Sequence, residues 1–278
     1  MIPGFDIEAF VAATLAEDLG PGVDVTSQAV IPADARFDAV MDTRDAITVA
    51  GLEVAAAFFR RLDPDARIEP LVADGAKVPK GAALMRIEGR ARALLTAERS
   101  ALNTVQHLSG IATLTAGYVA KIAGTGAILL DTRKTIPGLR VLEKYATRMG
   151  GARNHRMGLW DAAMIKDNHV AVAGGVGEAV RRARDAGIAE IIVEVDHIDQ
   201  IEPALAAGAT RLLLDNMPPP VLRGAVTLVG GRVPTEASGG VTLETIRAIA
   251  ETGVNFISVG RITQSAPAAD IGLDFALA

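Results

Sequence analysis

The feature that most constrains the fold of this chain is a repeated pattern, a short apolar run that ends in polar residues. After Gly126 the pattern occurs six times, and helical patterns at residues 177–186, 198–207, 219–229 and 243–251 separate the later runs. Alternating buried strands and amphipathic helices predict a parallel βα barrel. The polar ends of the runs are Asp131, Lys166, Glu194-Val195-Asp196, Asp215-Asn216, Glu236-Ala237-Ser238-Gly239-Gly240 and Val259-Gly260-Arg261.

Six runs are fewer than the eight strands of a complete barrel. The sequence therefore predicts an α/β fold with an incomplete parallel βα barrel. In such barrels the carboxyl ends of the strands meet at one mouth, which carries the active site. We expect the polar ends to surround a single site.

The first third of the chain has a different pattern. Helical spacing at residues 6–19 and 51–62 alternates with strand-like patterns at 35–49 and 68–88, which predicts an N-terminal α+β sandwich domain over residues 1–108. One or two long helices are expected at 94–119, with a break near Ser109-Gly110. The barrel domain is predicted at 109–266, and the tail 267–278 is expected to pack on the N-terminal domain.

Positive charge is concentrated at the predicted mouth, although the 278-residue chain has a formal net charge of −5. Such a concentration predicts a site for an anionic small molecule. No basic helix or stripe extends beyond it, which argues against nucleic acid as a partner. The clustered cations are Arg133, Lys134, Arg153, Arg156 and Lys166.

The composition argues against several other classes of protein. The chain has no cysteine, so a disulfide framework, a thiolate zinc site and a cysteine nucleophile are excluded. The first residues lack the pattern of a signal peptide, and no apolar run reaches the roughly 18 to 20 residues of a membrane span. We therefore expect a cytoplasmic protein with no membrane partner.

Carboxylates and glycines are expected at the same mouth. Glu194 and Asp215 each follow a buried run, and beside so many cations they suit a magnesium ion shared with substrate phosphates. The alternative is that each carboxylate pairs with a neighbouring lysine or arginine. Ser238-Gly239-Gly240 and Val259-Gly260 end the last two strands, where glycines allow backbone amides to approach a phosphate.

Two histidines and one arginine have more than one interpretation. His155 and His169 could act as general acids or bases, but a histidine among arginines is more often neutral and hydrogen-bonded. Arg99 lies off the apolar face of its predicted helix, where spacing alone favours a surface salt bridge.

Four lysines suggest rival functions. Lys134 or Lys166 at a strand end could form a Schiff base in a lyase. Lys77 and Lys80 lie in a segment similar to the hairpins of lipoyl or biotinyl carriers, where a lysine takes the cofactor, although solvated loop charges are the commoner interpretation. Borohydride trapping would test the first rival, and an intact mass would test the second.

Several longer segments are more specific than any single residue. They are Asp131-Thr-Arg-Lys-Thr-Ile-Pro-Gly138, Gly150-Gly-Ala-Arg-Asn-His-Arg156, Ile165-Lys-Asp-Asn-His169, Glu194-Val-Asp196, Leu214-Asp-Asn216 and Glu236-Ala-Ser-Gly-Gly240, with Thr96-Ala-Glu-Arg-Ser-Ala-Leu-Asn103 and Leu108-Ser-Gly-Ile111 before them. Together these segments resemble the quinolinate phosphoribosyltransferases (carboxylating nicotinate-nucleotide pyrophosphorylases), nearly from end to end.

The resemblance implies an activity and an assembly. The activity is phosphoribosyl transfer from phosphoribosyl pyrophosphate to quinolinate with decarboxylation. It gives nicotinate mononucleotide, pyrophosphate and carbon dioxide in NAD biosynthesis, with magnesium as cofactor. The assembly is a homodimer in which each site combines the barrel of one subunit with the N-terminal domain of the other.

The resemblance also implies roles for individual residues. The two carboxylates of quinolinate would be bound by Arg133, His155, Arg156 and Lys166, with Arg99 of the partner subunit. Lys134 would lie near the phosphoribosyl pyrophosphate, Glu194 and Asp215 near its ribose hydroxyls and magnesium, and Ser238, Gly239, Gly240 and Gly260 around its phosphate.

Near its end the chain departs from the family pattern. The family often has Gly-Ala-Leu-Thr-His-Ser where this chain has Gly260-Arg261-Ile262-Thr263-Gln264-Ser265. The resemblance therefore assigns no role to Arg261 and Gln264.

Overall fold

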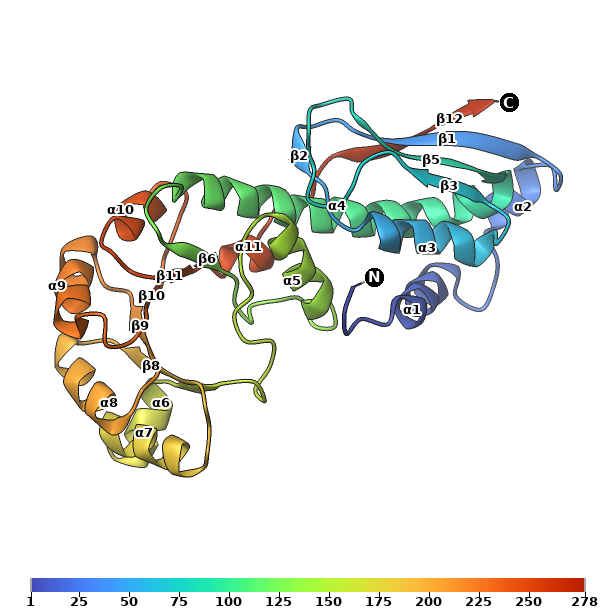
Figure 1. Cartoon of the computed structure of the whole chain (residues 1–278). Coiled ribbons are helices and arrows are strands. Elements are labelled where there is room, and N and C mark those ends of the chain that lie inside the picture. The colour runs from blue at the N-terminus through green and yellow to red at the C-terminus, as the bar shows by residue number, and fades with distance from the viewer. Residues whose placement is uncertain (1, 278) are drawn as a thin grey trace. The chain divides into compact units, whose positions relative to one another are not determined.

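The computed structural model describes residues 2–277 and divides the chain into two compact units (Figure 1). The first unit comprises Met1–Ala116, Val141–Gly151 and Ser265–Ala278, and the second comprises Gly117–Arg140 and Ala152–Gln264. The predicted domain boundary, between residues 108 and 109, stays a prediction.

The first unit is built on an antiparallel sheet with the strand order β12-β1-β5-β3. Along β5 buried and exposed residues alternate from Met85 to Arg90, because successive side chains of a strand point to opposite faces. One face of the sheet is therefore covered, and Figure 1 shows α3 and α4 along it. The strands are β1 (Arg36–Thr43), β3 (Arg67–Pro70), β5 (Ala83–Arg90) and β12 (Ile271–Leu277), with a separate pair β2 (Ile47–Thr48) and β4 (Lys77–Val78).

Helices complete the first unit. In α3 (Leu52–Leu62) the apolar residues face the core, and Phe58 and Phe59 are fully buried. Asp6 caps α1 (Ile7–Leu19) by accepting a hydrogen bond of 2.9 Å from the Ala9 amide. The other elements are α2 (Val25–Val30), most of α5 (Arg140–Met149) and most of α4 (Ala91–Lys121).

The predicted break near Ser109-Gly110 is wrong, because α4 runs without interruption from Ala91 to Lys121. The Ser109 hydroxyl is buried and bonds both backbone groups of Ala50, at 3.0 Å from its amide and 3.2 Å from its carbonyl. Gly110 serves close packing, since an ideal Cβ there would lie 2.0 Å from the Pro267 carbonyl oxygen. The two residues that suggested a break are therefore packing contacts of a continuous helix.

Gly110→Ala should destabilise the protein by about 1 to 3 kcal/mol, because the methyl group would displace the backbone at Pro267. Gly117→Ala is the matched control in the same helix, since its nearest contact is 3.8 Å away. The control should be neutral or stabilising by up to about 1 kcal/mol, because alanine favours the helix. Urea unfolding measures both changes. Equal stability of the two variants would contradict the proposed contact at Gly110.

The second unit contains a six-stranded parallel sheet with the order β6-β11-β10-β9-β8-β7. Its strands carry buried apolar runs, as expected for a parallel sheet covered on both faces. This mixed α/β architecture confirms the predicted fold class. The strands are β6 (Ile128–Leu130), β7 (Ala163–Ile165), β8 (Ile191–Val195), β9 (Arg211–Asp215), β10 (Thr235–Ser238) and β11 (Phe256–Ser258).

Most of the helices that connect these strands lie on the outer side of the curved sheet (Figure 1), and α11 follows its last strand. The predicted helix at 219–229 has these bounds, the one at 198–207 is present as η1 followed by α8, and those at 177–186 and 243–251 are present with shifted ends. Two helices, α6 and α11, are additional. The helices that follow β7 in the chain are α6 (Asp167–Ala173), α7 (Val176–Asp185), η1 (Ile198–Gln200), α8 (Ile201–Ala207), α9 (Pro219–Val229), α10 (Ile246–Ala250) and α11 (Arg261–Gln264).

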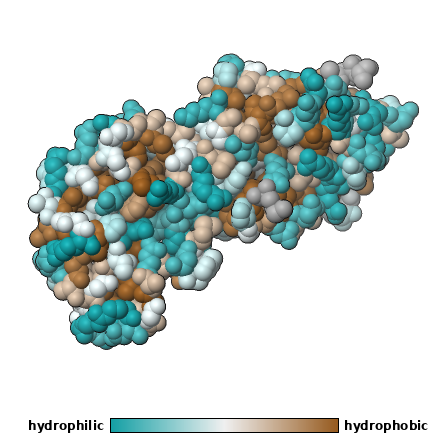
Figure 2. Space-filling model, viewed as in Figure 1, coloured by the Kyte–Doolittle hydropathy of each residue, from teal (hydrophilic) through white to brown (hydrophobic). Residues whose placement is uncertain are grey.

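The described surface is mixed in character. Figure 2 shows polar residues interspersed with apolar ones on the visible face, and the most exposed large apolar side chains are Trp160 and Val172, at 82% and 90%. Among the described residues, no helix is both long and apolar enough to cross a membrane.

Candidate active site

The carboxyl ends of the six parallel strands surround one cavity of about 660 Å³, a volume suited to a small-molecule ligand. All of its lining residues belong to the second unit. They are Thr132, Arg133, Lys134, His155, Arg156, Met164, Lys166, Glu194, Leu213, Asp215, Asn216, Glu236, Ser238, Gly239, Gly240, Val241, Thr242, Ser258, Val259, Gly260, Arg261 and Gln264.

One wall of the cavity carries two arginines whose polar groups are only partly used within the protein. The Nε atoms of Arg133 and Arg156 are buried and have no hydrogen-bond partner among the described residues. Arg156 donates from Nη1 to the Ala162 carbonyl at 2.9 Å. Burial, and then the charge of Arg133, lower the pKa of Arg156 from its ordinary value. Two adjacent cations with unused donors favour an anionic ligand.

A buried aspartate fixes the loop that carries Arg156. Asp131 follows β6 and is fully buried. It accepts hydrogen bonds from the His155 amide at 2.8 Å and from Asn154 Nδ2 at 2.6 Å. Leu130 and Arg153 form a parallel bridge beside this point. The Asp131 carboxylate therefore holds the segment Asn154-His155-Arg156 at the end of β6, which is a structural role.

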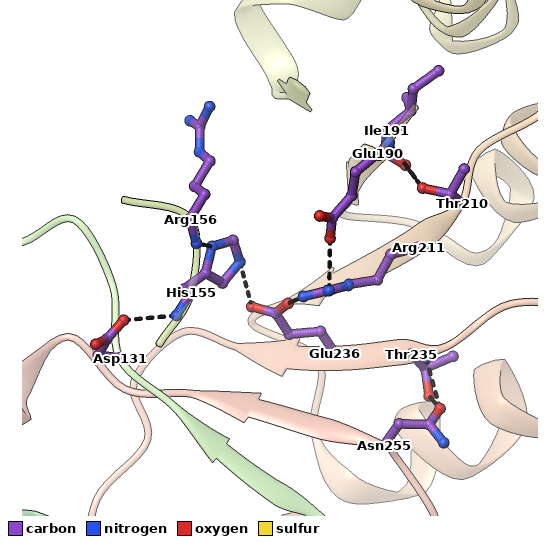
Figure 3. A network of polar contacts seen from close by, with 10 residues as sticks. All are labelled: Asp131, His155, Arg156, Glu190, Ile191, Thr210, Arg211, Thr235, Glu236 and Asn255. Atoms are coloured by element: carbon purple, nitrogen blue, oxygen red, sulfur yellow. Dashed lines mark hydrogen bonds and ion pairs between the residues drawn. The ribbon is translucent and has the colours of Figure 1, made fainter. Parts of the chain in front are cut away.

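Glu236 is a buried member of the site that the sequence did not single out. It lies in β10, is fully buried, and faces His155 on one side and Arg211 on the other (Figure 3). Burial by itself would raise its pKa, but His155, Ser258 and Arg211 outweigh burial and hold the pKa of Glu236 below its usual value. The cavity floor thus contains an ionised carboxylate.

Three carboxylates lie close together at the carboxyl ends of β8 and β9, and two of them, Glu194 and Asp215, line the cavity. Glu194, Asp196 and Asp215 bring oxygen atoms within 4.8 Å of one another. Hard oxygen donors at this spacing fit a divalent ion such as magnesium. Lys166 Nζ forms an ion pair with Glu194, so the predicted alternative of a lysine partner also holds for this carboxylate. Asp196 was not among the predicted ligands.

The ends of β9 and β10 form a tight glycine corner. Gly239 and Gly240 have φ values of +92° and +58°, and an ideal Cβ on Gly239 would lie 2.0 Å from Asn216 Oδ1. Asn216 has a φ of +52°, the only positive value among the described residues other than glycine. Its Nδ2 donates to Asp215 Oδ2 at 2.6 Å. Gly239 is therefore needed for its close packing against Asn216, and both glycines line the cavity.

The absence of a side chain at Gly260 makes room for the side chain of Lys134. An ideal Cβ on Gly260 would lie 2.7 Å from Lys134 Cδ. The backbone of Lys134 is held by Thr132, whose Oγ1 accepts from its amide at 3.0 Å, and by Thr263, whose hydroxyl donates to its carbonyl at 2.7 Å. The exposed Lys134 side chain therefore extends over a glycine from a fixed backbone.

The cavity brings together the predicted site residues of the barrel and adds others, but Arg153, one of the clustered cations, is exposed and does not line it. Arg261 and Gln264, to which no role was assigned, also line it. Met164 and Leu213 contribute apolar surface that belongs to a buried cluster with Ala162 and Ile192. The sequence does not identify Met164 and Leu213 as cavity residues, because apolar residues in strands are expected to fill a core.

Other candidates lie away from the cavity. Arg99 is exposed on α4 in the first unit and does not line it. His169 is exposed, and its Nδ1 accepts a hydrogen bond from the Lys166 amide at 3.0 Å at the start of α6. Lys77 lies in β4, opposite Thr48, and Lys80 lies in an exposed turn. The hydrogen bond between His169 and the Lys166 amide gives His169 a structural role at the start of α6.

Comparisons with known proteins agree with this geometry. The family models "Quinolinate phosphoribosyl transferase, N-terminal domain" and "C-terminal domain" match residues 24–109 and 111–274. The chain is 44% identical over 271 residues to a carboxylating nicotinate-nucleotide pyrophosphorylase of Mycobacterium leprae, covering 95% of each protein. It is 42% identical over 291 residues to a chloroplastic one of Arabidopsis thaliana, covering 98% of this chain and 83% of that protein.

A solved structure supports the same assignment. The nicotinate-nucleotide pyrophosphorylase of Francisella tularensis has a TM-score of 0.94 and 40% sequence identity to this chain, and the match covers 99% of each chain.

Proposed function

We infer that this chain, which belongs to the quinolinate phosphoribosyltransferase family, transfers a phosphoribosyl group from phosphoribosyl pyrophosphate to quinolinate with decarboxylation. The products are nicotinate mononucleotide, pyrophosphate and carbon dioxide, in NAD biosynthesis. The observation that carries the assignment within the cavity is the pair Arg133 and Arg156, two cations that line the cavity and whose buried Nε atoms have no hydrogen-bond partner among the described residues.

The chemistry explains why the site is rich in cations. The ring nitrogen of quinolinate already has a lone pair, so it can attack the anomeric carbon as the bond to pyrophosphate breaks. This step requires positioning and charge stabilisation. The alkylated ring is then cationic and accepts the electron pair released when the adjacent carboxylate leaves as carbon dioxide. A proton from water replaces that carboxylate.

We propose that Arg133, Arg156 and Lys166 form a cation wall that binds the substrate dianion. Arg133, Arg156 and Lys166 would pair with its two carboxylates, and His155 lies in the same wall. Because Lys166 is paired with Glu194 in the free protein, it would exchange this partner for the substrate. Binding would then release Glu194 for the second substrate.

A second group of residues at the cavity would bind phosphoribosyl pyrophosphate. Lys134 would neutralise the leaving pyrophosphate, and Glu194 and Asp215 would contact the ribose hydroxyls. Ser238, Gly239, Gly240 and Gly260 would surround the ribose phosphate with backbone groups. Magnesium, held by Glu194 and Asp215 directly or through water, with Asp196 beside them, would supply positive charge to the pyrophosphate.

The test is a direct assay. The protein, quinolinate, phosphoribosyl pyrophosphate and magnesium should give nicotinate mononucleotide, identified by its mass. If borohydride instead traps a carbonyl compound on Lys134 or Lys166, the lyase alternative replaces this function. A cytoplasmic location stays a prediction.

We further propose a homodimer in which Arg99 serves the site of the partner subunit. The exposed position of Arg99 and its absence from the cavity lining are consistent with this role. A two-fold axis that brings one Arg99 to the partner's barrel brings the partner's Arg99 back, so both sites would be completed at once.

Mixing Arg99→Ala subunits with Lys134→Ala subunits should restore activity toward roughly a quarter of wild type when subunits exchange at random. In a mixed dimer with shared sites, one site carries both lesions and the other carries neither. Native mass spectrometry verifies the exchange. Exchange without any return of activity would show that Arg99 serves its own chain or has only a structural role.

A further inference from the structure

The floor of the cavity contains a continuous polar network that the reaction chemistry does not explain (Figure 3). Arg211 Nη2 lies 2.7 Å from Glu190 Oε1, and Arg211 Nη1 lies 3.3 Å from Glu236 Oε2. The Arg211 guanidinium also lies 4.8 Å from the centre of the Phe256 ring. Arg211 is therefore held from three sides and presents a fixed positive charge to Glu236.

The other oxygen of Glu236 faces the cavity wall. Glu236 Oε1 lies 3.3 Å from His155 Nε2, and both side chains are buried. A buried carboxylate is costly unless charged or polar partners surround it. Here Arg211 takes one oxygen and His155 takes the other, so Glu236 transmits the fixed position of Arg211 to the imidazole.

The second nitrogen of His155 defines the tautomer of the ring. His155 Nδ1 accepts a hydrogen bond of 2.7 Å from the Arg156 amide. Nδ1 must then carry a lone pair, which places the ring proton on Nε2, toward Glu236. The opposite tautomer would set two N–H groups against each other at Nδ1 and a lone pair against a carboxylate at Nε2. Both ends of the ring therefore favour the same tautomer.

The network ends at the proposed ligand for the substrate carboxylate. The Arg156 amide is fixed by the His155 ring, and the His155 amide is fixed by Asp131 at 2.8 Å. With its backbone held in this way, Arg156 places a buried Nε donor in the cavity wall.

We propose that Glu236 is a positioning residue that holds His155 as the neutral Nε2–H tautomer and thereby orients Arg156 toward an anionic substrate. This inference rests on the proposed function for the identity of the substrate. Glu236 stabilises binding without touching the substrate, and His155 acts by hydrogen bonding and not by charge.

The first test is spectroscopic and needs no turnover. In a long-range proton–nitrogen correlation spectrum of protein labelled with 15N-histidine, the His155 signals are those lost in His155→Asn. Wild type should show a protonated Nε2 and an unprotonated Nδ1 at neutral pH. A His155 imidazolium, or the Nδ1–H tautomer, would overturn the proposal. The tautomer is read from the wild-type protein, and His155→Asn serves only to assign the signals.

The second test uses Glu236→Gln, which keeps the shape of the side chain. The amide can turn its NH2 group toward His155 Nε2, so the Nδ1–H tautomer should become populated and the ring should lose the Arg156 amide. The KM for quinolinate should rise by about tenfold or more, as for other residues that orient a ligand-binding group. The kcat and the KM for phosphoribosyl pyrophosphate should change less.

Glu190→Gln is the matched control, because it removes a carboxylate from the same network at a half-exposed position that touches Arg211 and does not line the cavity. It should leave the His155 spectrum and the KM for quinolinate unchanged, because the glutamine amide oxygen can still accept from Arg211 and the contacts of Glu236 are kept. An unchanged tautomer and KM in Glu236→Gln, or an equal rise of KM in Glu190→Gln, would refute the positioning role. If wild type does not turn over quinolinate, the proposed function fails, and the tautomer spectrum alone decides the role of Glu236.

Discussion

Nicotinate in place of quinolinate should lower kcat/KM by roughly 30-fold to several thousand-fold. Nicotinate lacks one of the two carboxylates, so part of the cation wall would stay unpaired in the complex. Arg133 and Arg156 have buried Nε donors without a partner among the described residues, and such groups gain most from an anionic ligand. Leaving a buried charge without its partner costs about 2 to 5 kcal/mol, which corresponds to this range.

Steady-state kinetics with each substrate and phosphoribosyl pyrophosphate measures the effect. Benzene-1,2-dicarboxylate is the control ligand, because it keeps both carboxylates but has no ring nitrogen to attack. It should compete with quinolinate and give no product. Comparable use of nicotinate and quinolinate would instead indicate a neighbouring phosphoribosyltransferase activity.

Lys134→Ala and Asp215→Ala should each lower kcat by about a hundredfold or more while unfolding free energy changes little. Removing one group that stabilises developing charge commonly costs that much. Lys134 is exposed and Asp215 is only half-buried, so neither contributes much to packing. Their charges at the strand ends are free to serve the pyrophosphate and the metal.

The measurement combines kcat, a magnesium titration and urea unfolding for each variant. Lys121→Ala is a suitable control, since Lys121 is an exposed lysine of the second unit outside the cavity lining. It should behave as wild type. Normal turnover of Asp215→Ala with an unchanged magnesium requirement would refute the role of Asp215, and normal turnover of Lys134→Ala would refute that of Lys134.

The sequence predicts the barrel well because each strand there is a compact apolar run that ends in a polar residue. A parallel strand buried on both faces needs such a run, and its carboxyl end is where ligands bind. Leu212-Leu213-Leu214 followed by Asp215 illustrates both requirements, and these residues form β9 and the cavity edge. The pattern therefore reveals both the strand and its functional end.

Residues whose roles depend on partners distant in sequence were not predicted. Glu236 appears in the sequence as one more polar residue at a strand end, but it is buried by contacts with His155 and Arg211, which come from other parts of the chain. Gly110 suggested a helix break because glycine has a low helix propensity. Its packing contact with the backbone at Pro267 was not predicted, because Pro267 is far away in sequence. Local patterns report propensity, whereas these two roles are set by tertiary contacts.

The most direct test of the proposed reaction is to follow quinolinate labelled with 13C in its 2-carboxylate in the presence of phosphoribosyl pyrophosphate and magnesium. The reaction transfers the phosphoribosyl group and expels that carboxylate in the same turnover. We predict one labelled carbon dioxide for each pyrophosphate released, and none when phosphoribosyl pyrophosphate is omitted. Labelled carbon dioxide without phosphoribosyl pyrophosphate, or pyrophosphate release with the label retained in the product, would contradict the assignment.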